Sequence, residues 1–292
     1  MQLSPRYDAE PLIALDGDQT AIAEPLVEQR RRLVETLASL SDDEWQHPSR
    51  CDGWTVRDVI VHLDSTNAFW NFSIKSGRKG VPSKLLATFD PVAGPAGLVS
   101  GSHALSSSAV FESFAASCSA LAETVAALDP EHFDLPAESP VGHVSIATML
   151  HHALWDSWIH ERDITLPLGR GRGRETTEAD REIVASLRYA ASLSPAFAVN
   201  AAQMAAAGGA SSRPCSLSIT ASDPDVAITI DVDDRVTVRG GLDPASVVTF
   251  TGDAVGLLEA LSQRAPMPAE AGEVAEQHAW LLSGLATVFD QN

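Results

Sequence analysis

The densest group of residues able to do chemistry lies between positions 151 and 163, where the chain reads His-His-Ala-Leu-Trp-Asp-Ser-Trp-Ile-His-Glu-Arg-Asp. Residues four apart on an α-helix share a face, so His152, Asp156 and His160 would form a polar stripe on an otherwise apolar helix. An aspartate and a histidine one turn apart can bind one divalent metal ion, with a third ligand from another helix. The pattern indicates a metal site; the alternative interpretation is a surface ion pair.

The best candidate for the third ligand is His62, which stands alone among apolar residues in Val-Ile-Val-His-Leu. A buried polar side chain is costly unless it has a partner, and a metal ion is one such partner. The alternative is a core histidine that bonds to a backbone carbonyl. His62, Asp156 and His160 together would leave a divalent ion with an open coordination position, as catalytic sites require.

Helices must carry these residues, and apolar residues at helical spacing predict helices over 24–40, 55–74, 103–128 and 144–165. Thr55 and Asp58 have the spacing of a capping box that begins the second helix. Four long amphipathic helices favour an antiparallel bundle. The three arginines at 30–32 are expected on its solvent face. Segment 77–100 is rich in glycine and proline and is predicted to be a long loop.

A different pattern follows a further helix that is predicted to end near residue 207. Short β-rich runs separated by polar turns predict strands, which are expected at 216–220, 226–230, 235–238 and 246–250. Helices are expected at 253–264 and 272–289. The sequence therefore predicts two domains, a helical one over residues 1–207 and a small α+β domain over 210–292.

Composition excludes several classes of partner. The 292 residues carry 20 Lys and Arg against 39 Asp and Glu, a formal charge of −19, which argues against nucleic acid and against a basic membrane contact. No run approaches the ~20 apolar residues of a membrane span. The three cysteines form no C-x-x-C pair. We expect a soluble, cytoplasmic protein, monomeric or homodimeric.

Two segments together resemble a known family. They are Cys51-Asp-Gly-Trp-Thr-Val-Arg-Asp-Val-Ile-Val-His62-Leu, preceded by Trp45, and Trp155-Asp-Ser-Trp-Ile-His160-Glu-Arg-Asp-Ile164. Both are similar to the mycothiol-dependent maleylpyruvate isomerase family, part of the DinB-like superfamily of metalloenzymes. The likeness covers about residues 24–170, and the C-terminal residues resemble, more weakly, the small domain of two-domain members. It implies an N-terminal DinB-like four-helix bundle followed by a small C-terminal α+β domain.

The resemblance also implies a function. The family's metal triad maps onto His62, Asp156 and His160, although the isomerase pattern has glutamate where this chain has the shorter Asp156. In the family a divalent metal, most simply zinc with iron or nickel as alternatives, takes the thiol of mycothiol, and a coordinated thiol loses its proton. The expected activity is that of a mycothiol-dependent S-transferase or isomerase acting on an electrophilic small molecule.

Four further residues are assigned secondary roles. His152 is a candidate base one turn from the ligands, and His143 is a candidate proton shuttle on a loop between helices. Arg57 and Arg78 are candidates for contacting the cofactor. Two alternatives to the thiol enzyme stay open: a non-haem iron enzyme, because two histidines and a carboxylate also suit Fe(II), and a non-catalytic binding module on the same fold.

Overall fold

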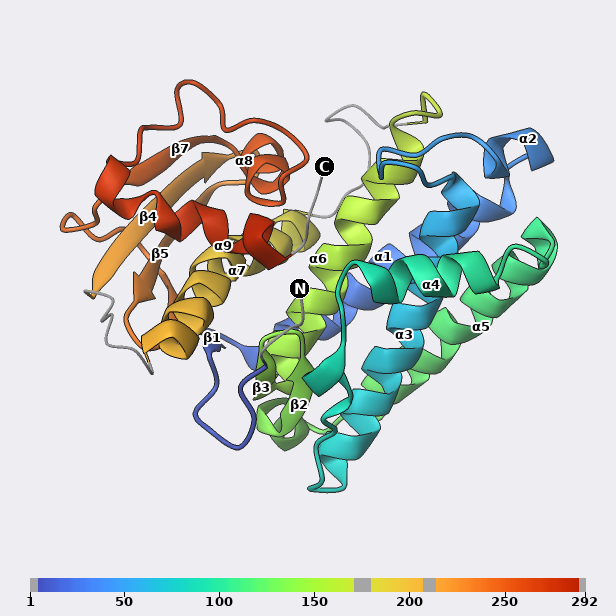
Figure 1. Cartoon of the computed structure of the whole chain (residues 1–292), viewed down its shortest axis with the longest axis horizontal. Coiled ribbons are helices and arrows are strands. Elements are labelled where there is room, and N and C mark those ends of the chain that lie inside the picture. Colours follow the sequence, from blue (N-terminus) through green and yellow to red (C-terminus); the bar gives the residue numbers. More distant parts are fainter. Residues whose placement is uncertain (1–4, 171–179, 207–213, 289–292) are drawn as a thin grey trace.

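The computed structural model describes residues 5–170, 180–206 and 214–288. The predicted bundle is confirmed: four helices pack side by side (Figure 1), and they are α1 (Ala23–Ala38), α3 (Val56–Arg78), α5 (Ser107–Ala126) and α6 (Ile146–Thr165). The short helix η1 (Gln19–Ile22) precedes α1. Other short helices connect the four, namely α2 (Asp42–Trp45), η2 (Leu85–Thr88), α4 (Ala93–Gly101) and η3 (Pro130–Asp134). None of the described helices is long and apolar enough to cross a membrane.

Side-chain caps determine where the ligand-bearing helices begin. The Thr55 hydroxyl accepts from the Asp58 backbone N–H while the Asp58 carboxylate accepts from the Thr55 N–H, which is the capping box predicted for α3. Ser145 caps α6 through the Thr148 N–H. Both caps satisfy backbone donors that a helix start leaves without partners.

The prediction of one solvent-facing arginine cluster in α1 was wrong for two of its three members. Arg31 is exposed, but Arg30 is 3% exposed and donates to Asn67 of α3 and to the Ala153 carbonyl of α6. Arg32 is mostly buried between two carboxylates of α6 and α7. Their polar partners come from other helices, so the pattern of α1 alone could not show their burial.

Two segments predicted to be loops contain regular structure. Within 77–100, the Asp90 carboxylate accepts from the N–H groups of Val92 and Ala93 and begins the short helix α4, which packs on α3. The turn-rich segment before α6 forms the hairpin β2 (Pro136–Ser139) and β3 (Gly142–Ser145). Both segments are rich in glycine, proline or turn residues, so the sequence pattern predicted loops there.

The C-terminal part is a five-stranded mixed sheet, ordered β1-β6-β5-β4-β7. The four predicted strands are present as β4 (Cys215–Ser222), β5 (Val226–Val232), β6 (Val236–Gly240) and β7 (Thr249–Asp253). The fifth, β1 (Ile13–Leu15), was not predicted because it has three residues, and it pairs in parallel with β6 from the far end of the chain. The domain boundary predicted near residue 208 falls outside the described residues.

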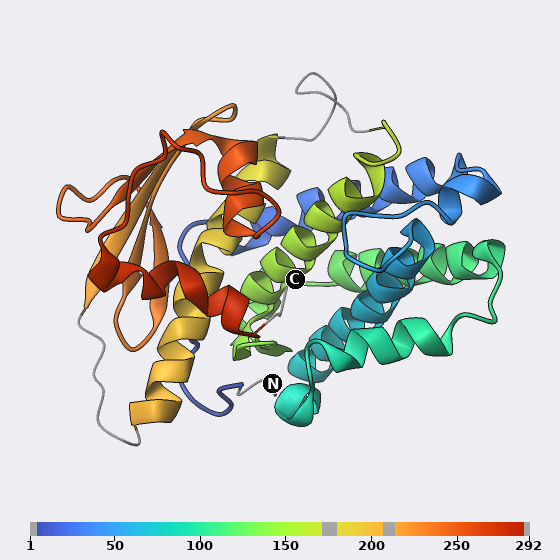
Figure 2. The ribbon, with the colours of Figure 1, turned by 45° about the horizontal axis from the view of Figure 1, so that its top comes forward.

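Helix α7 (Asp180–Ala206) lies between the sheet and the bundle. It contacts α6 on one side and β5 and β6 on the other, and α8 (Ala254–Leu261) and α9 (Trp280–Val288) pack beside it (Figure 2). The short helix η4 (Glu276–His278) precedes α9. One hydrophobic core runs through both parts, from Trp158 of α6 and Tyr189 of α7 to Ile230 of the sheet. The sheet therefore packs on α7, and α7 packs on α6, the helix that carries the predicted metal-ligand stripe.

Close helix packing generates a first prediction. A Cβ at Gly284 of α9 would lie 2.1 Å from the Ser194 carbonyl oxygen of α7, so Gly284→Ala must push the helices apart. We expect the free energy of unfolding to fall by about 1–3 kcal/mol in urea titrations. Gly97→Ala in α4, where a Cβ would meet nothing within 4 Å, is the control and should be neutral or slightly stabilising. Equal effects of the two substitutions would contradict the packing.

Candidate metal centre

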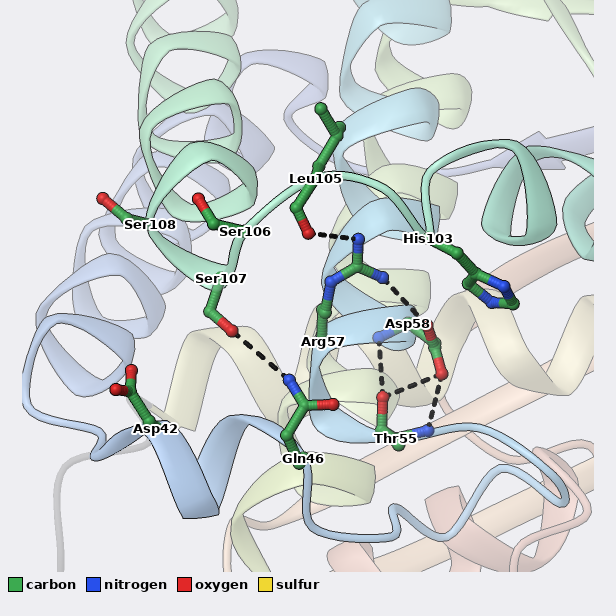
Figure 3. A pocket seen from close by; sticks show the side chains of 10 residues that line it. All are labelled: Asp42, Gln46, Thr55, Arg57, Asp58, His103, Leu105, Ser106, Ser107 and Ser108. Atoms are coloured by element: carbon green, nitrogen blue, oxygen red, sulfur yellow. Dashed lines mark hydrogen bonds and ion pairs between the residues drawn. The ribbon is translucent and has the colours of Figure 1, made fainter.

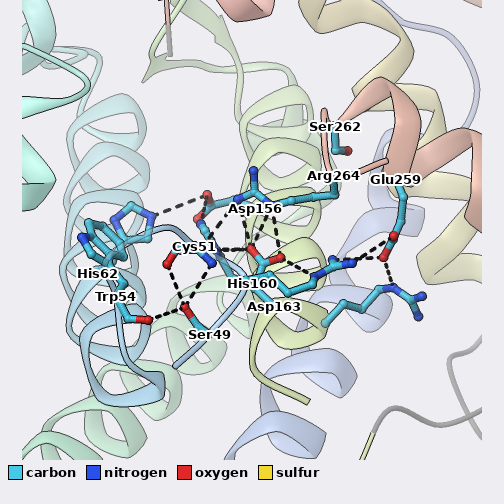
Figure 4. Close-up of polar contacts among 12 residues, drawn as sticks. Ser49, Cys51, Trp54, His62, Asp156, His160, Asp163, Glu259, Ser262 and Arg264 are labelled. Atoms are coloured by element: carbon cyan, nitrogen blue, oxygen red, sulfur yellow. Dashed lines mark hydrogen bonds and ion pairs between the residues drawn. The ribbon is translucent and has the colours of Figure 1, made fainter. Parts of the chain in front are cut away.

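The three predicted ligands lie together where α3 and α6 pack. His62 Nε2 and His160 Nε2 are each 3.7 Å from Asp156 Oδ1, and the imidazole rings of the two histidines are 5.0 Å apart at their centroids (Figure 4). All three ligand atoms lie within 4.8 Å of one another. The shorter aspartate, where the isomerase pattern has glutamate, therefore still reaches a point between both histidines.

The surroundings keep this carboxylate ionised. Burial alone would raise the pKa of Asp156, but the nearby imidazoles of His62 and His160 hold it well below its ordinary value. Thr66, one turn beyond His62 on α3, lies with its hydroxyl 3.5 Å from the other Asp156 oxygen. Asp156 therefore carries a negative charge, and its Oδ1 lies between the Nε2 atoms of His62 and His160.

His160 uses its other nitrogen to contact a second carboxylate. Its Nδ1 lies 3.0 Å from Asp163 Oδ2, three residues further along α6. Asp163 is fully buried and also accepts from Arg50 Nε at 3.0 Å and Arg264 Nε at 3.1 Å. Burial would raise the pKa of Asp163, but His160 and Arg264 hold it well below its ordinary range.

A second group of potential ligand atoms overlaps the first. Cys51 Sγ lies 3.5 Å from His160 Nδ1 and donates to Asp163 Oδ2 at 3.2 Å, so Cys51, His160 and Asp163 also cluster closely enough to hold a metal ion. Burial and the charge of Asp163 raise the pKa of the Cys51 thiol to about 12. Sequence reasoning gave Cys51 no metal role; its position just before the His62 helix was the available signal.

The C-terminal part supplies side chains that no local pattern indicated. Arg264 follows α8 and reaches Asp163, and Glu259 of α8 accepts from Arg50 and from Arg162. Trp155 of α6 donates its indole N–H to the Ser262 hydroxyl at 2.8 Å. The metal-ligand helix is thereby tied to the sheet domain by charged and polar contacts around Asp163.

His152 lies on the same face of α6, one turn before Asp156. It is 5% exposed, and its ring is in contact with the rings of Trp70, Trp155 and Tyr189, with centroids 4.9–5.5 Å away. Its Nδ1 is 2.7 Å from the Tyr189 hydroxyl. Burial lowers the pKa of His152 to about 4, so the imidazole is neutral at pH 7.

The other predicted residues lie elsewhere. His143 is on β3, where its Nε2 hydrogen-bonds with the Ser83 carbonyl and its ring packs on Tyr7. Arg78 is exposed at the last turn of α3, 16 residues or about 24 Å along the helix from His62. The described contacts of His143 are with residues outside the ligand cluster, and the proposed roles of both residues stay predictions.

Arg57 lines a cavity of about 700 Å³ at the start of α3 (Figure 3). It is buried and donates to the carbonyls of Ser102 and Leu105, which hold the turn between α4 and α5. Most of the residues that line the cavity have polar side chains, and they are Asp42, Gln46, Thr55, Arg57, Asp58, His103, Leu105, Ser106, Ser107 and Ser108. Asp58 in this wall is one helical turn before His62.

Comparison with known proteins agrees with this architecture. Residues 26–165 match the family model of the mycothiol maleylpyruvate isomerase N-terminal domain. This region belongs to that family. The chain is also similar to the crystal structure of the mycothiol-dependent maleylpyruvate isomerase, with a TM-score of 0.54, 15% identity and coverage of 88% of this chain and 94% of that one. A histidine-to-alanine mutant of that isomerase matches with a TM-score of 0.52, the same identity and the same coverage.

At this identity the likeness of the two structures shows the fold. It extends across the bundle and the sheet domain, since it covers 88% of the chain. No curated protein matches the chain. The family domain spans α3 and α6, so it includes all three predicted ligands.

The Asp163 cluster generates a second prediction. Its carboxyl has a lower pKa in the folded chain than in the unfolded one, so it stabilises the fold above its ordinary pKa of 3.8, and that stabilisation is lost as the pH falls below this value. Asp163→Asn should lower the free energy of unfolding at pH 7 by about 3–5 kcal/mol because it removes the buried carboxylate that Arg50 and Arg264 share. It should also flatten the loss of stability from about pH 5 to pH 3.

Urea titrations of the metal-free protein across this pH range measure both effects. Glu273→Gln, at an exposed position, is the control and should keep the stability and the pH profile of the wild type. A pH profile of Asp163→Asn as steep as that of the wild type would contradict the assignment.

Proposed function

We propose that this protein is a metal-dependent enzyme that uses mycothiol, a low-molecular-weight thiol, to isomerise an electrophilic small molecule or to transfer the thiol onto it. The observation that carries the proposal is the convergence of two imidazole nitrogens and one carboxylate oxygen from α3 and α6. The family domain supports it, and the similar solved enzyme is by its description mycothiol-dependent.

The ligand atoms fit a divalent metal ion such as zinc. Ligands bound at about 2.0–2.2 Å in a tetrahedral arrangement lie roughly 3.3–3.6 Å apart, and both histidine nitrogens are close to that separation, at 3.7 Å from Asp156 Oδ1. Three protein ligands are typical of catalytic zinc sites, which keep one position open. Nickel and iron accept the same donor types, so the donor set favours zinc without excluding them.

Two overlapping groups of side chains could bind the metal, and His160 belongs to both. The orientation of its ring favours one of them. Its Nε2 is directed at His62 and Asp156, while its Nδ1 is bonded to Asp163. Histidines that bind metal commonly donate their second N–H to a carboxylate, which orients the ring. Asp163 already has two arginine partners and Cys51 holds its proton, so we assign metal binding to His62, Asp156 and His160, and orientation to Asp163.

A divalent ion bound there would supply a Lewis acid that lowers the pKa of a coordinated thiol. The chain's own residues have distinct tasks. Asp163 holds His160 in place. The ring of Trp54, just before α3, packs on His62, and the ring of Trp70 of α3 packs on His152. His152 presents a neutral imidazole one turn from Asp156.

For the cofactor we propose contact with the cavity that Arg57 lines, because Asp58 in its wall lies one turn from His62. Arg57 would act by holding the α4–α5 turn, whose Ser106–Ser108 segment offers hydroxyl groups. Isomerisation and thiol transfer require the same ligands, so both outcomes remain within the proposal. The substrate in either case is a small electrophile.

A third prediction tests the metal assignment. Purified wild-type protein should contain about one divalent ion per chain, and His160→Ala should retain at most about a tenth of it, because a two-ligand remainder binds weakly. His47→Ala, at an exposed histidine, is the matched control and should keep the wild-type metal content. Elemental mass spectrometry measures the metal content of all three proteins.

Activity is measured on the same samples as consumption of mycothiol with an electrophile, and as isomerisation of maleylpyruvate in its presence. We expect activity in the wild type and in His47→Ala, and loss with His160→Ala. Negligible and equal metal in all three proteins would contradict the proposal.

A further inference from the structure

We propose that Tyr189 is a positioning residue that fixes His152 in one tautomer, with the proton on Nε2, so that a neutral N–H donor stands beside the metal ligands. The use of this donor on a substrate rests on the proposed function. The tautomer itself does not, because it follows from hydrogen bonds within the chain.

The location of His152 follows from the packing of α3 against α6. Along α3, His62 faces Asp156 and His160, and Trp70 two turns later faces His152. The two helices are therefore antiparallel, and His152 lies next along α6 from Asp156 on the ligand face. Tyr189 reaches the same point from α7 and is 1% exposed.

Hydrogen-bond accounting selects the tautomer. The Tyr189 hydroxyl has one hydrogen to donate, and among the described residues its hydrogen-bond partner is His152 Nδ1, at 2.7 Å. If Nδ1 carried the proton and donated to the tyrosine oxygen, the buried hydroxyl hydrogen would have no acceptor in this part of the chain. If Nδ1 instead offers its lone pair, the hydroxyl and Nδ1 are both satisfied, and the proton of the neutral ring is on Nε2.

Nε2 is the nitrogen available to a bound molecule. It has no hydrogen-bond partner among the described residues. It is also absent from their fully enclosed atoms that lack a partner, so part of its surface is accessible. The Trp70 indole nitrogen in the same cluster is enclosed and also has no partner in the described chain. Aromatic walls around a neutral donor suit a planar, conjugated molecule that presents a carbonyl, enolate or carboxylate oxygen.

A donor held in advance toward such an oxygen stabilises negative charge as it develops there. Burial keeps His152 neutral, so it would act by hydrogen bonding and would not need to release a proton. Tyr189 acts only through His152, since its described hydrogen bond is with that ring.

Nitrogen NMR of the full-length protein labelled with ¹⁵N-histidine tests the tautomer at pH 7, and loss of the signal in His152→Gln assigns it. We expect wild-type His152 to be protonated at Nε2 alone. Tyr189→Phe removes the donor to Nδ1 and should shift the ring to a mixture of tautomers or to Nδ1–H. Tyr7→Phe is the matched control, because Tyr7 packs on His143 instead, and it should leave the His152 signals unchanged.

Protonation of wild-type His152 at Nδ1 would overturn the inference. This test uses the wild type alone, so it holds even if Tyr189→Phe does not fold. An unchanged tautomer in folded Tyr189→Phe would overturn it too. If the proposed function holds, Tyr189→Phe should keep its metal and lose at least about tenfold in kcat. A wild type without metal or thiol activity would refute the proposed function while leaving the tautomer result to decide the inference.

Discussion

The hydrogen bond between His160 Nδ1 and Asp163 is the contact on which the rest of the site depends. An imidazole with one nitrogen fixed can present the other in a single direction, and here that direction is toward Asp156 and His62. Asp163 can hold the ring because it is fully buried and is itself held by Arg50 and Arg264. The geometry of a ligand in the bundle thus depends on a side chain from the C-terminal part.

This dependence explains why the two parts share one core. Helix α7 packs on α6 and on the sheet, and β1 from the start of the chain completes that sheet. Arg264, Glu259 and Ser262 all approach α6 from the end of α8. Removing the sheet and α8 would therefore expose Asp163 and take away Arg264, one of the two arginines that hold it, although all three predicted metal ligands lie in the bundle.

Sequence reasoning succeeded where the information was local. The stripe of His152, Asp156 and His160 follows from helical spacing, and His62 was visible as one polar residue in an apolar run. The four bundle helices and four of the five sheet strands were predicted for the same reason, since each has a clear period and several turn or cap signals.

The missing pieces depend on tertiary placement. Nothing near Arg264 or Tyr189 in the sequence shows that they meet α6, because their partners lie 101 and 37 residues away. Arg30 looks like a surface residue until Asn67 and Ala153 are placed around it. Strand β1 is too short to have a period, and α4 lies within a segment rich in glycine and proline, where Asp90 accepts from backbone N–H groups at its start.

X-ray absorption at the metal edge, on metal-loaded protein without added thiol, is the most direct test of which atoms bind the ion. Ligation by His62, Asp156 and His160 predicts nitrogen and oxygen neighbours at about 2.0–2.2 Å and no sulfur. A sulfur neighbour at about 2.3 Å in the thiol-free protein would instead place Cys51 on the metal and contradict the orienting role of Asp163.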